Sequence, residues 1–455
     1  MLTSSQTERL RSLESKMDMM LNGNFNCPTK RVVDDLIVQY DERCNYQPLP
    51  LFNSDFTRTY ELRDEELVNA VLAIALRISP EKANQPDQES SSTYAARVNE
   101  IVAEKLSNGG IGLATIQALC LLSFWEFTGG QKEHSWLHLD VALWLAKESR
   151  LTEEPEWDID PSELEERRRC AWSLYILGRT CGMSSSLPDF TCRFPGATYS
   201  LDRSLDAPAR DAELIIANNI RLYDIWGKVQ HFAAQSNVEA GKSLWTGDSE
   251  YGSIISALME YESQFPDEHR FSEQTSGAFK DNKAYWAPWF SIQFMYHAIL
   301  CVLNHPFLLS MRLDPIRESS PRTFRQTTAD LAKLHSYWAF RFIGVAKEWD
   351  YEVTDPLIAY AVTIAATIFD HYRLSDETQA KRDARDKFTK CVSFVREAAK
   401  IWPIAANMAQ ITPDSHTDSN APLTPEIRQF EQSLQNTLLD DVLGASFEWW
   451  DQGNL

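Results

Sequence analysis

Helical spacing of apolar residues runs through most of this 455-residue chain and restricts its fold more than any other feature. From Thr93 onward, apolar side chains recur every three or four residues, and the stretches between them are short and polar. Alternating strand patterns flanked by Asn-Gly or Asp-Gly turns are absent. We therefore predict an all-α fold, a large multi-helix domain, with helices at about 63–78, 93–107, 112–127, 132–148, 160–180, 208–236, 250–264, 284–311, 323–348, 355–373 and 382–402.

The first 25 residues are expected to form a short coiled-coil-like helix that precedes a helical domain over 26–405. Its apolar positions follow 3-4-3 spacing with charged residues between them, which is typical of a coiled-coil seam. The pattern lasts only about two heptads, so an amphipathic helix on the domain surface is an equal alternative. The candidate dimer seam is Leu10, Leu13, Met17 and Met20.

The C-terminal end is expected to hold a polar, proline-punctuated linker over 406–425 and an acidic, aromatic tail over 426–455. The tail has six acidic residues and one arginine, a net charge of −5. Such segments typically order when their aromatic groups dock on a partner. The alternative is a last helix that folds back on the core. The candidate partner-binding residues are Phe447, Trp449 and Trp450.

Overall charge and cysteine spacing exclude several classes of protein. The chain has 65 acidic and 44 basic residues, a net charge of −21, and so repels nucleic acid and anionic membranes. No two of the eight cysteines form a C-x-x-C unit, which argues against zinc fingers and iron–sulfur sites. The absence of a signal peptide favours an intracellular compartment, and the longest apolar stretches are shorter than the ~20 residues of a membrane helix.

No catalytic motif stands out, so we expect the chain not to be an enzyme. It has no G-x-S-x-G, phosphate-binding loop or H-E-x-x-H. His134 and His138 have metal-ligand spacing but no supporting ligand nearby, and Asp34-Asp35 lacks the spacing of helical terpene cyclases. No catalytic, cofactor-binding or metal residue is therefore assigned, and an all-helical enzyme is kept as a minor alternative.

The helix expected at 160–180 carries the most informative residues. Asp160 is its expected N-cap, Pro161 suits the first helical position and Glu163 would complete a capping box. Three successive arginines near a helix start oppose the helix dipole, so they need specific partners, which the glutamates three and four residues earlier could supply. We predict a buried ion-pair network with an aromatic anchor made of Arg167, Arg168, Arg169, Trp172, Tyr175 and Arg179.

This run resembles the central signature of the fungal-specific transcription factor domain, the middle homology region of fungal binuclear zinc-cluster regulators. That signature reads E-x-R-R-R-x-x-W-x-L-Y-x-x-D-R and leads to G-R-P. Here Gly178 stands in place of the Asp, and Ser186-Leu187-Pro188 in place of G-R-P. Further matching segments follow in order between about 60 and 400: Gln117-Ala118-Leu119, Tyr296-His297, His305-Pro306-Phe307-Leu308 and Pro356-Leu357-Ile358-Ala359-Tyr360.

The resemblance implies a nuclear transcriptional regulator for a specific pathway or metabolite gene set. Its expected partners are the transcription machinery or co-regulators, a homo- or heterodimer partner and a small-molecule effector, with no membrane. DNA would be reached only indirectly or through a separate module, because the six cysteines of a zinc cluster are missing. No cofactor is expected in this chain, and zinc only if a zinc-cluster module lies upstream. The alternative is a co-regulator that does not bind DNA and pairs with a zinc-cluster protein.

Overall fold

The computed structural model describes residues 30–53, 56–79, 89–183, 187–196, 207–234, 243–272, 282–313, 320–372 and 378–410. Within these ranges every regular element is a helix, which confirms the predicted all-α, multi-helix fold. The coiled-coil-like helix expected over 1–25 and the tail over 426–455 lie outside the described residues.

The helices are α2 (Lys30–Arg43), α3 (Phe56–Thr59), η1 (Tyr60–Leu62), α4 (Glu65–Ile78), α6 (Ser91–Asn108), α7 (Leu113–Thr128), α8 (Lys132–Glu148), α9 (Pro161–Thr180), α10 (Ala207–Ala234), α11 (Glu250–Gln264), η3 (Asp267–His269), α12 (Lys283–Leu303), α13 (Pro306–Leu313), α14 (Arg322–Glu348), α15 (Pro356–Tyr372), α16 (Thr378–Ala399) and α17 (Pro403–Gln410).

Three α-helices were missed and one expected helix is wrong. Helices α2, α3 and α17 were not predicted, nor were the short helices η1 and η3, and residues 406–410, expected in the linker, belong to α17. The single helix expected over 284–311 is instead the pair α12 and α13. The side chain of Asn304 donates to the carbonyl of Leu300 at 2.8 Å, and Pro306 has no N–H with which to continue the helical ladder.

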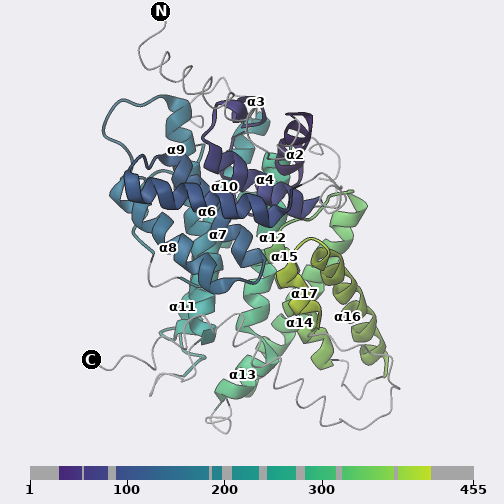
Figure 1. The fold of residues 1–455 in the computed structure, drawn as a ribbon. Helices are drawn as coiled ribbons and strands as arrows, with labels where there is room; N and C mark the ends of the chain where they lie inside the picture. The colour runs from purple at the N-terminus through teal and green to yellow at the C-terminus, as the bar shows by residue number, and fades with distance from the viewer. Residues whose placement is uncertain are drawn as a thin grey trace, which may run out of the picture.

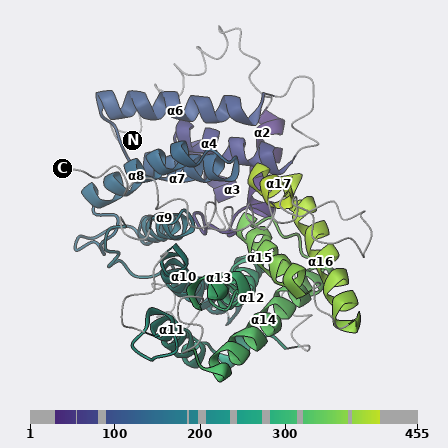
Figure 2. The same ribbon diagram turned by 90° about the horizontal axis from the view of Figure 1, so that it is seen from below.

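The helices pack in layers around two centres (Figure 1). Helices α6, α4 and α7 stack on one another in the first half of the chain, whereas α10, α14 and α15 surround α12 in the second (Figure 2). Helix α12 carries a nearly continuous run of buried residues that includes Trp289, Phe290 and Phe294. It therefore forms the core of the second half.

By length and composition, Lys283–Ser310 is also apolar enough to cross a membrane, contrary to the expectation from the sequence. This stretch includes α12 and part of α13. However, 72% of its apolar window is buried inside the protein. A buried core helix passes the same compositional test, and the packing around α12 accounts for its apolar character.

The two halves are joined by contacts of the end of α2 and the loop after it with the loop before α15, and of the residue before α17 with α7. Arg43 pairs with Glu352, and the backbone N–H of Thr354 donates to the side chain of Gln47 at 3.0 Å. The indole of Trp402 donates to the carbonyl of Thr354 at 2.8 Å and packs edge-on against Phe124 of α7. The first two of these contacts link residues 309 and 307 positions apart in the sequence.

Candidate functional site

Helix α9 carries the arginine signature and begins at the N-cap and proline that the sequence predicts, although the side chain of Glu163 does not complete the expected capping box. The carboxylate of Asp160 accepts from the backbone N–H groups of Ser162 and Glu163, at 3.0 and 3.4 Å, and Pro161 occupies the first turn. The cap satisfies two of the donors that a helix start leaves open. Most of the remaining α9 side chains are buried, so the helix lies inside the protein rather than on its surface.

Arg169 is the most deeply placed of the three arginines. Its Nε donates to Glu165 at 2.8 Å, and both side chains are buried, at 7% and 1% exposure. Glu165 also accepts from the backbone N–H of Gly196 at 2.9 Å, and Arg169 reaches the carbonyls of Pro50 and Phe52 at 3.4 Å. This pair therefore fixes α9 to two loops at once.

Arg168 and Arg167 have partners that helical spacing does not indicate. Arg168 binds Glu154, which also accepts from the backbone N–H of Arg193 at 3.0 Å. Although burial opposes it, these hydrogen bonds lower the pKa of Glu154. Arg167 donates to the carbonyls of Ser149 and Arg150 at the end of α8.

The aromatic part of the signature packs against the loop that follows α9 and against α10. The indole of Trp172 donates to the carbonyl of Arg193 at 2.9 Å, and its ring lies 4.8 Å from that of Phe194. The hydroxyl of Tyr175 and the guanidinium of Arg179 both donate to the same Asp224 oxygen, at 2.9 and 2.8 Å. The structure thus brings all six signature residues into contacts within the protein.

The two departures from the family signature touch each other. A Cβ added at Gly178 would lie 2.5 Å from Cδ2 of Leu187. Gly178 therefore makes room for the leucine, so the positions that hold Asp and Arg in the family signature are here filled by a close apolar contact.

This contact gives a testable expectation for Gly178→Ala. Replacing a helical glycine by alanine normally adds up to about 1 kcal/mol of stability. We expect that gain at Gly344→Ala, where nothing lies within 4 Å of the new Cβ, but not at Gly178→Ala. The two variants should differ by about 1–2 kcal/mol in urea unfolding. Leu187→Ala should abolish the difference, and equal stabilisation by both glycine variants would contradict the proposed contact.

Groups suited to catalysis or metal binding are few in the described residues. No cluster of three potential metal ligands occurs in that part of the chain. His138 is bound to Glu126 at 2.7 Å. The described cysteines are buried and free, and burial raises the pKa of Cys44 to about 12, which keeps this thiol protonated.

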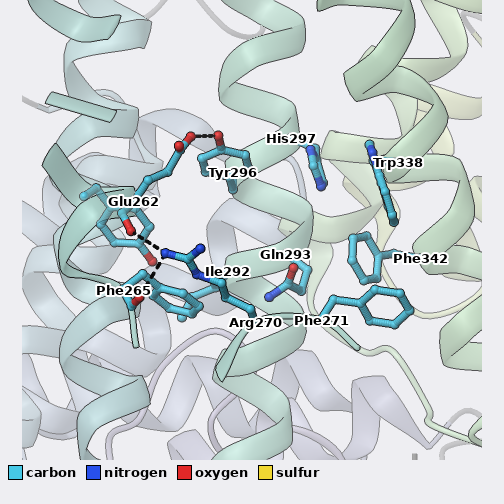
Figure 3. Close-up of a pocket in the computed structure, with 11 residues that line it drawn as sticks. Glu262, Phe265, Arg270, Phe271, Ile292, Gln293, Tyr296, His297, Trp338 and Phe342 are labelled. Carbon is cyan, nitrogen blue, oxygen red and sulfur yellow. Dashed lines mark hydrogen bonds between the residues drawn. The ribbon is translucent and has the colours of Figure 1, made fainter. Parts of the chain in front are cut away.

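A cavity of about 370 Å³ lies between α11, α12 and α14, and its lining residues are drawn in Figure 3. Six of the eleven lining residues are Phe, Tyr or Trp, so the walls are mainly aromatic. Trp338 and Phe342 come from α14, Tyr296 and His297 from α12, and Phe271 from the segment after η3 (Figure 3). The full set is Tyr261, Glu262, Phe265, Arg270, Phe271, Ile292, Gln293, Tyr296, His297, Trp338 and Phe342.

Four of the polar side chains that line this cavity are held by the protein itself. The hydroxyl of Tyr296 donates to the carboxylate of Glu262, and Nη2 of Arg270 donates to the carbonyls of Glu262 and Phe265 (Figure 3). The Nδ1 atoms of His297 and His335 lie 2.9 Å apart. Burial lowers the pKa of both histidines, so both are neutral at pH 7.

This cavity was not predicted from the sequence. The family resemblance placed Tyr296 and His297 on a helix, but the lining residues lie between 261 and 342 on separate elements. The signal in the sequence was only their aromatic character, which also describes ordinary core residues. The candidate dimer seam and the tail residues lie outside the described part of the chain, so their contacts are not given by the structure.

Comparison with known proteins agrees with the resemblance read from the motifs. Residues 42–212 match the model of the fungal specific transcription factor domain. The matched segment includes α9 with all six signature residues. No curated protein and no solved structure matches the chain.

Proposed function

We propose that this chain, which carries a fungal specific transcription factor domain, is a nuclear transcriptional regulator and not an enzyme. The observation that supports this most directly is the domain match over residues 42–212, which contains the arginine and aromatic signature of α9. The burial of that signature among its own partners favours a structural role for it. The helical domain then serves as a scaffold that relays a signal to other parts of the regulator.

The regulator acts through protein partners. A net charge of −21 opposes direct contact with DNA, so a partner or a separate basic module must supply that contact. We propose that Leu10, Leu13, Met17 and Met20 form a dimer seam and that the tail over 426–455 recruits the transcription machinery. The tail is suited to this task because its carboxylates keep Phe447, Trp449 and Trp450 in solution until they dock.

The tail is tested by fusing residues 420–455 to an unrelated DNA-binding domain in a reporter strain. We expect activation of the reporter, and a loss of at least about fivefold with Trp449→Ala and Trp450→Ala together, because buried aromatic anchors dominate such interfaces. Gln435→Ala in the same tail is the matched control and should leave activation unchanged. No activation by the intact fusion, or activation that is indifferent to the two tryptophans, would remove the tail from the proposal.

A further inference from the structure

We propose that the aromatic cavity between α11, α12 and α14 binds a small, flat, uncharged organic molecule of about three fused rings that carries a hydroxyl or carbonyl oxygen. The cavity lies outside the matched segment, residues 42–212, so the inference goes beyond the proposed function. Its ligand would give the helical domain a signal to relay. The size, wall chemistry, charge balance and polar groups of the cavity favour such a ligand.

Size and shape set the first limit. A volume of about 370 Å³ lies at the lower end of the range of small-molecule sites, and is too small for a folded peptide segment. The rings of His297 and Trp338 are nearly parallel, with an interplanar angle of 8° and centroids 6.0 Å apart. Phe271 meets Phe342 edge-on at 5.2 Å. Such walls offer both ring faces and ring edges, which favours a planar aromatic ligand.

Charge balance argues for an uncharged ligand. Glu262 and Arg270 are the two ionised groups of the lining, and their charges cancel. The carboxylate of Glu262 is already bound by Tyr296, and Arg270 also contacts Asp267 through Nε at 3.2 Å. Both groups lie at exposed positions, so an ion placed against the aromatic walls would lose water without gaining a buried counter-charge. A neutral molecule avoids this cost.

One polar group can orient an oxygen of the ligand. The side chain of Gln293 lines the cavity at a half-buried position, and its amide offers both donors and an acceptor. The hydroxyl of Tyr261 is buried inside the wall and is not accessible from the cavity. The amide of Gln293 therefore favours an oxygen-bearing ring system over a plain hydrocarbon.

The test uses a matched series of anthracene probes with the full chain. We expect 9-anthracenemethanol to bind at one site per chain with a micromolar dissociation constant, measured by fluorescence anisotropy and calorimetry. 9-Methylanthracene, which lacks the oxygen, should bind about fivefold more weakly. The cation 9-(aminomethyl)anthracene and the anion 9-anthracenecarboxylate should each bind at least about tenfold more weakly than the alcohol.

Variants assign the binding to this cavity. Gln293→Trp fills the cavity from a half-buried position, Trp338→Ala removes one wall, and each should weaken binding of 9-anthracenemethanol at least about tenfold. Gln293→Leu removes the amide at a half-buried position and should reduce the preference for the alcohol over 9-methylanthracene. Trp144→Ala, an exposed tryptophan on α8, is the matched control and should change nothing.

Three results would overturn the proposal. They are no saturable binding by the wild-type chain, unchanged binding in both Gln293→Trp and Trp338→Ala, or tightest binding of the cationic probe. Circular dichroism and melting temperatures separate lost binding from lost folding, and Gln293→Trp remains informative if Trp338→Ala does not fold. None of these results bears on the tail fusion, so the proposed regulator function fails or stands independently.

Discussion

Arg169→Ala is expected to lower the free energy of unfolding by about 3–5 kcal/mol, the largest loss among the three adjacent arginines. The reason is that the substitution leaves the Glu165 carboxylate without its arginine partner. Glu165 is 1% exposed, so without the guanidinium its charge stays buried with only the N–H of Gly196 to bind it. The same change also removes the donors that reach the carbonyls of Pro50 and Phe52. Urea unfolding followed by circular dichroism measures the loss.

The neighbouring arginine provides a matched control. Arg167 is only partly buried and donates to two carbonyls at the end of α8, so Arg167→Ala should cost about 1 kcal/mol. The double variant Glu165→Gln with Arg169→Met removes both charges and should be at least about 1–2 kcal/mol more stable than Arg169→Met alone. An equal loss for Arg167→Ala and Arg169→Ala would show that the buried ion pair does not dominate this helix.

The start and burial of α9 could be predicted because their causes are local. The cap at Asp160 and the proline after it act within one turn, and their residue types identify them. Of the ion pairs described for α9, only Arg169 with Glu165 follows helical spacing. Glu166, which was expected to bind an arginine of α9, pairs instead with Arg63, a residue 103 positions earlier. Partners of that kind depend on packing and have no signature in local spacing.

The helices that were missed have weak local signals for physical reasons. Helix α2 buries only Leu36, Ile37 and Tyr40, and its other residues are charged or partly exposed. Its position is held by tertiary contacts such as that of Arg43 with Glu352. The break between α12 and α13 falls at Asn304-His305-Pro306, between two apolar runs that share helical spacing, so periodicity alone did not mark it. The proline was the local signal for the break. The cavity was hidden for a related reason, because its aromatic walls come from three helices and the segment that joins two of them.

Acidification from pH 6 to pH 5 is expected to destabilise the protein by roughly 2–3 kcal/mol through its buried histidines. Burial lowers the pKa of His335 to about 4 and of His305 to about 3, and lowers that of His297 well below its usual value. All three stay neutral in the folded state, while the unfolded chain takes up protons near pH 6.5. The histidines contribute fully to the free energy of unfolding above pH 6.5, and this contribution is lost as the pH falls toward 4.

One buried acid changes the stability with pH in the opposite direction to the histidines. Asp355 is 3% exposed, and burial raises its pKa to about 7. The folded state therefore holds its proton below pH 7, whereas the unfolded chain releases it down to about pH 4, so acidification stabilises the protein at this site. Three histidines against one carboxyl leave a net uptake of about two protons on unfolding, and each proton corresponds to about 1.4 kcal/mol per pH unit.

Urea unfolding at pH 7.0, 6.0 and 5.0 measures the slope of the unfolding free energy against pH. His305→Gln keeps a neutral hydrogen-bonding group beside Thr367, so it should reduce the slope by about 1.4 kcal/mol per pH unit. Asp355→Asn should increase the slope by a similar amount, because it removes the opposing group. His134→Gln, on the exposed face of α8, is the control and should leave the slope unchanged. Stability that is constant or rising from pH 7 to pH 5 would mean that the buried histidines are protonated in the folded protein.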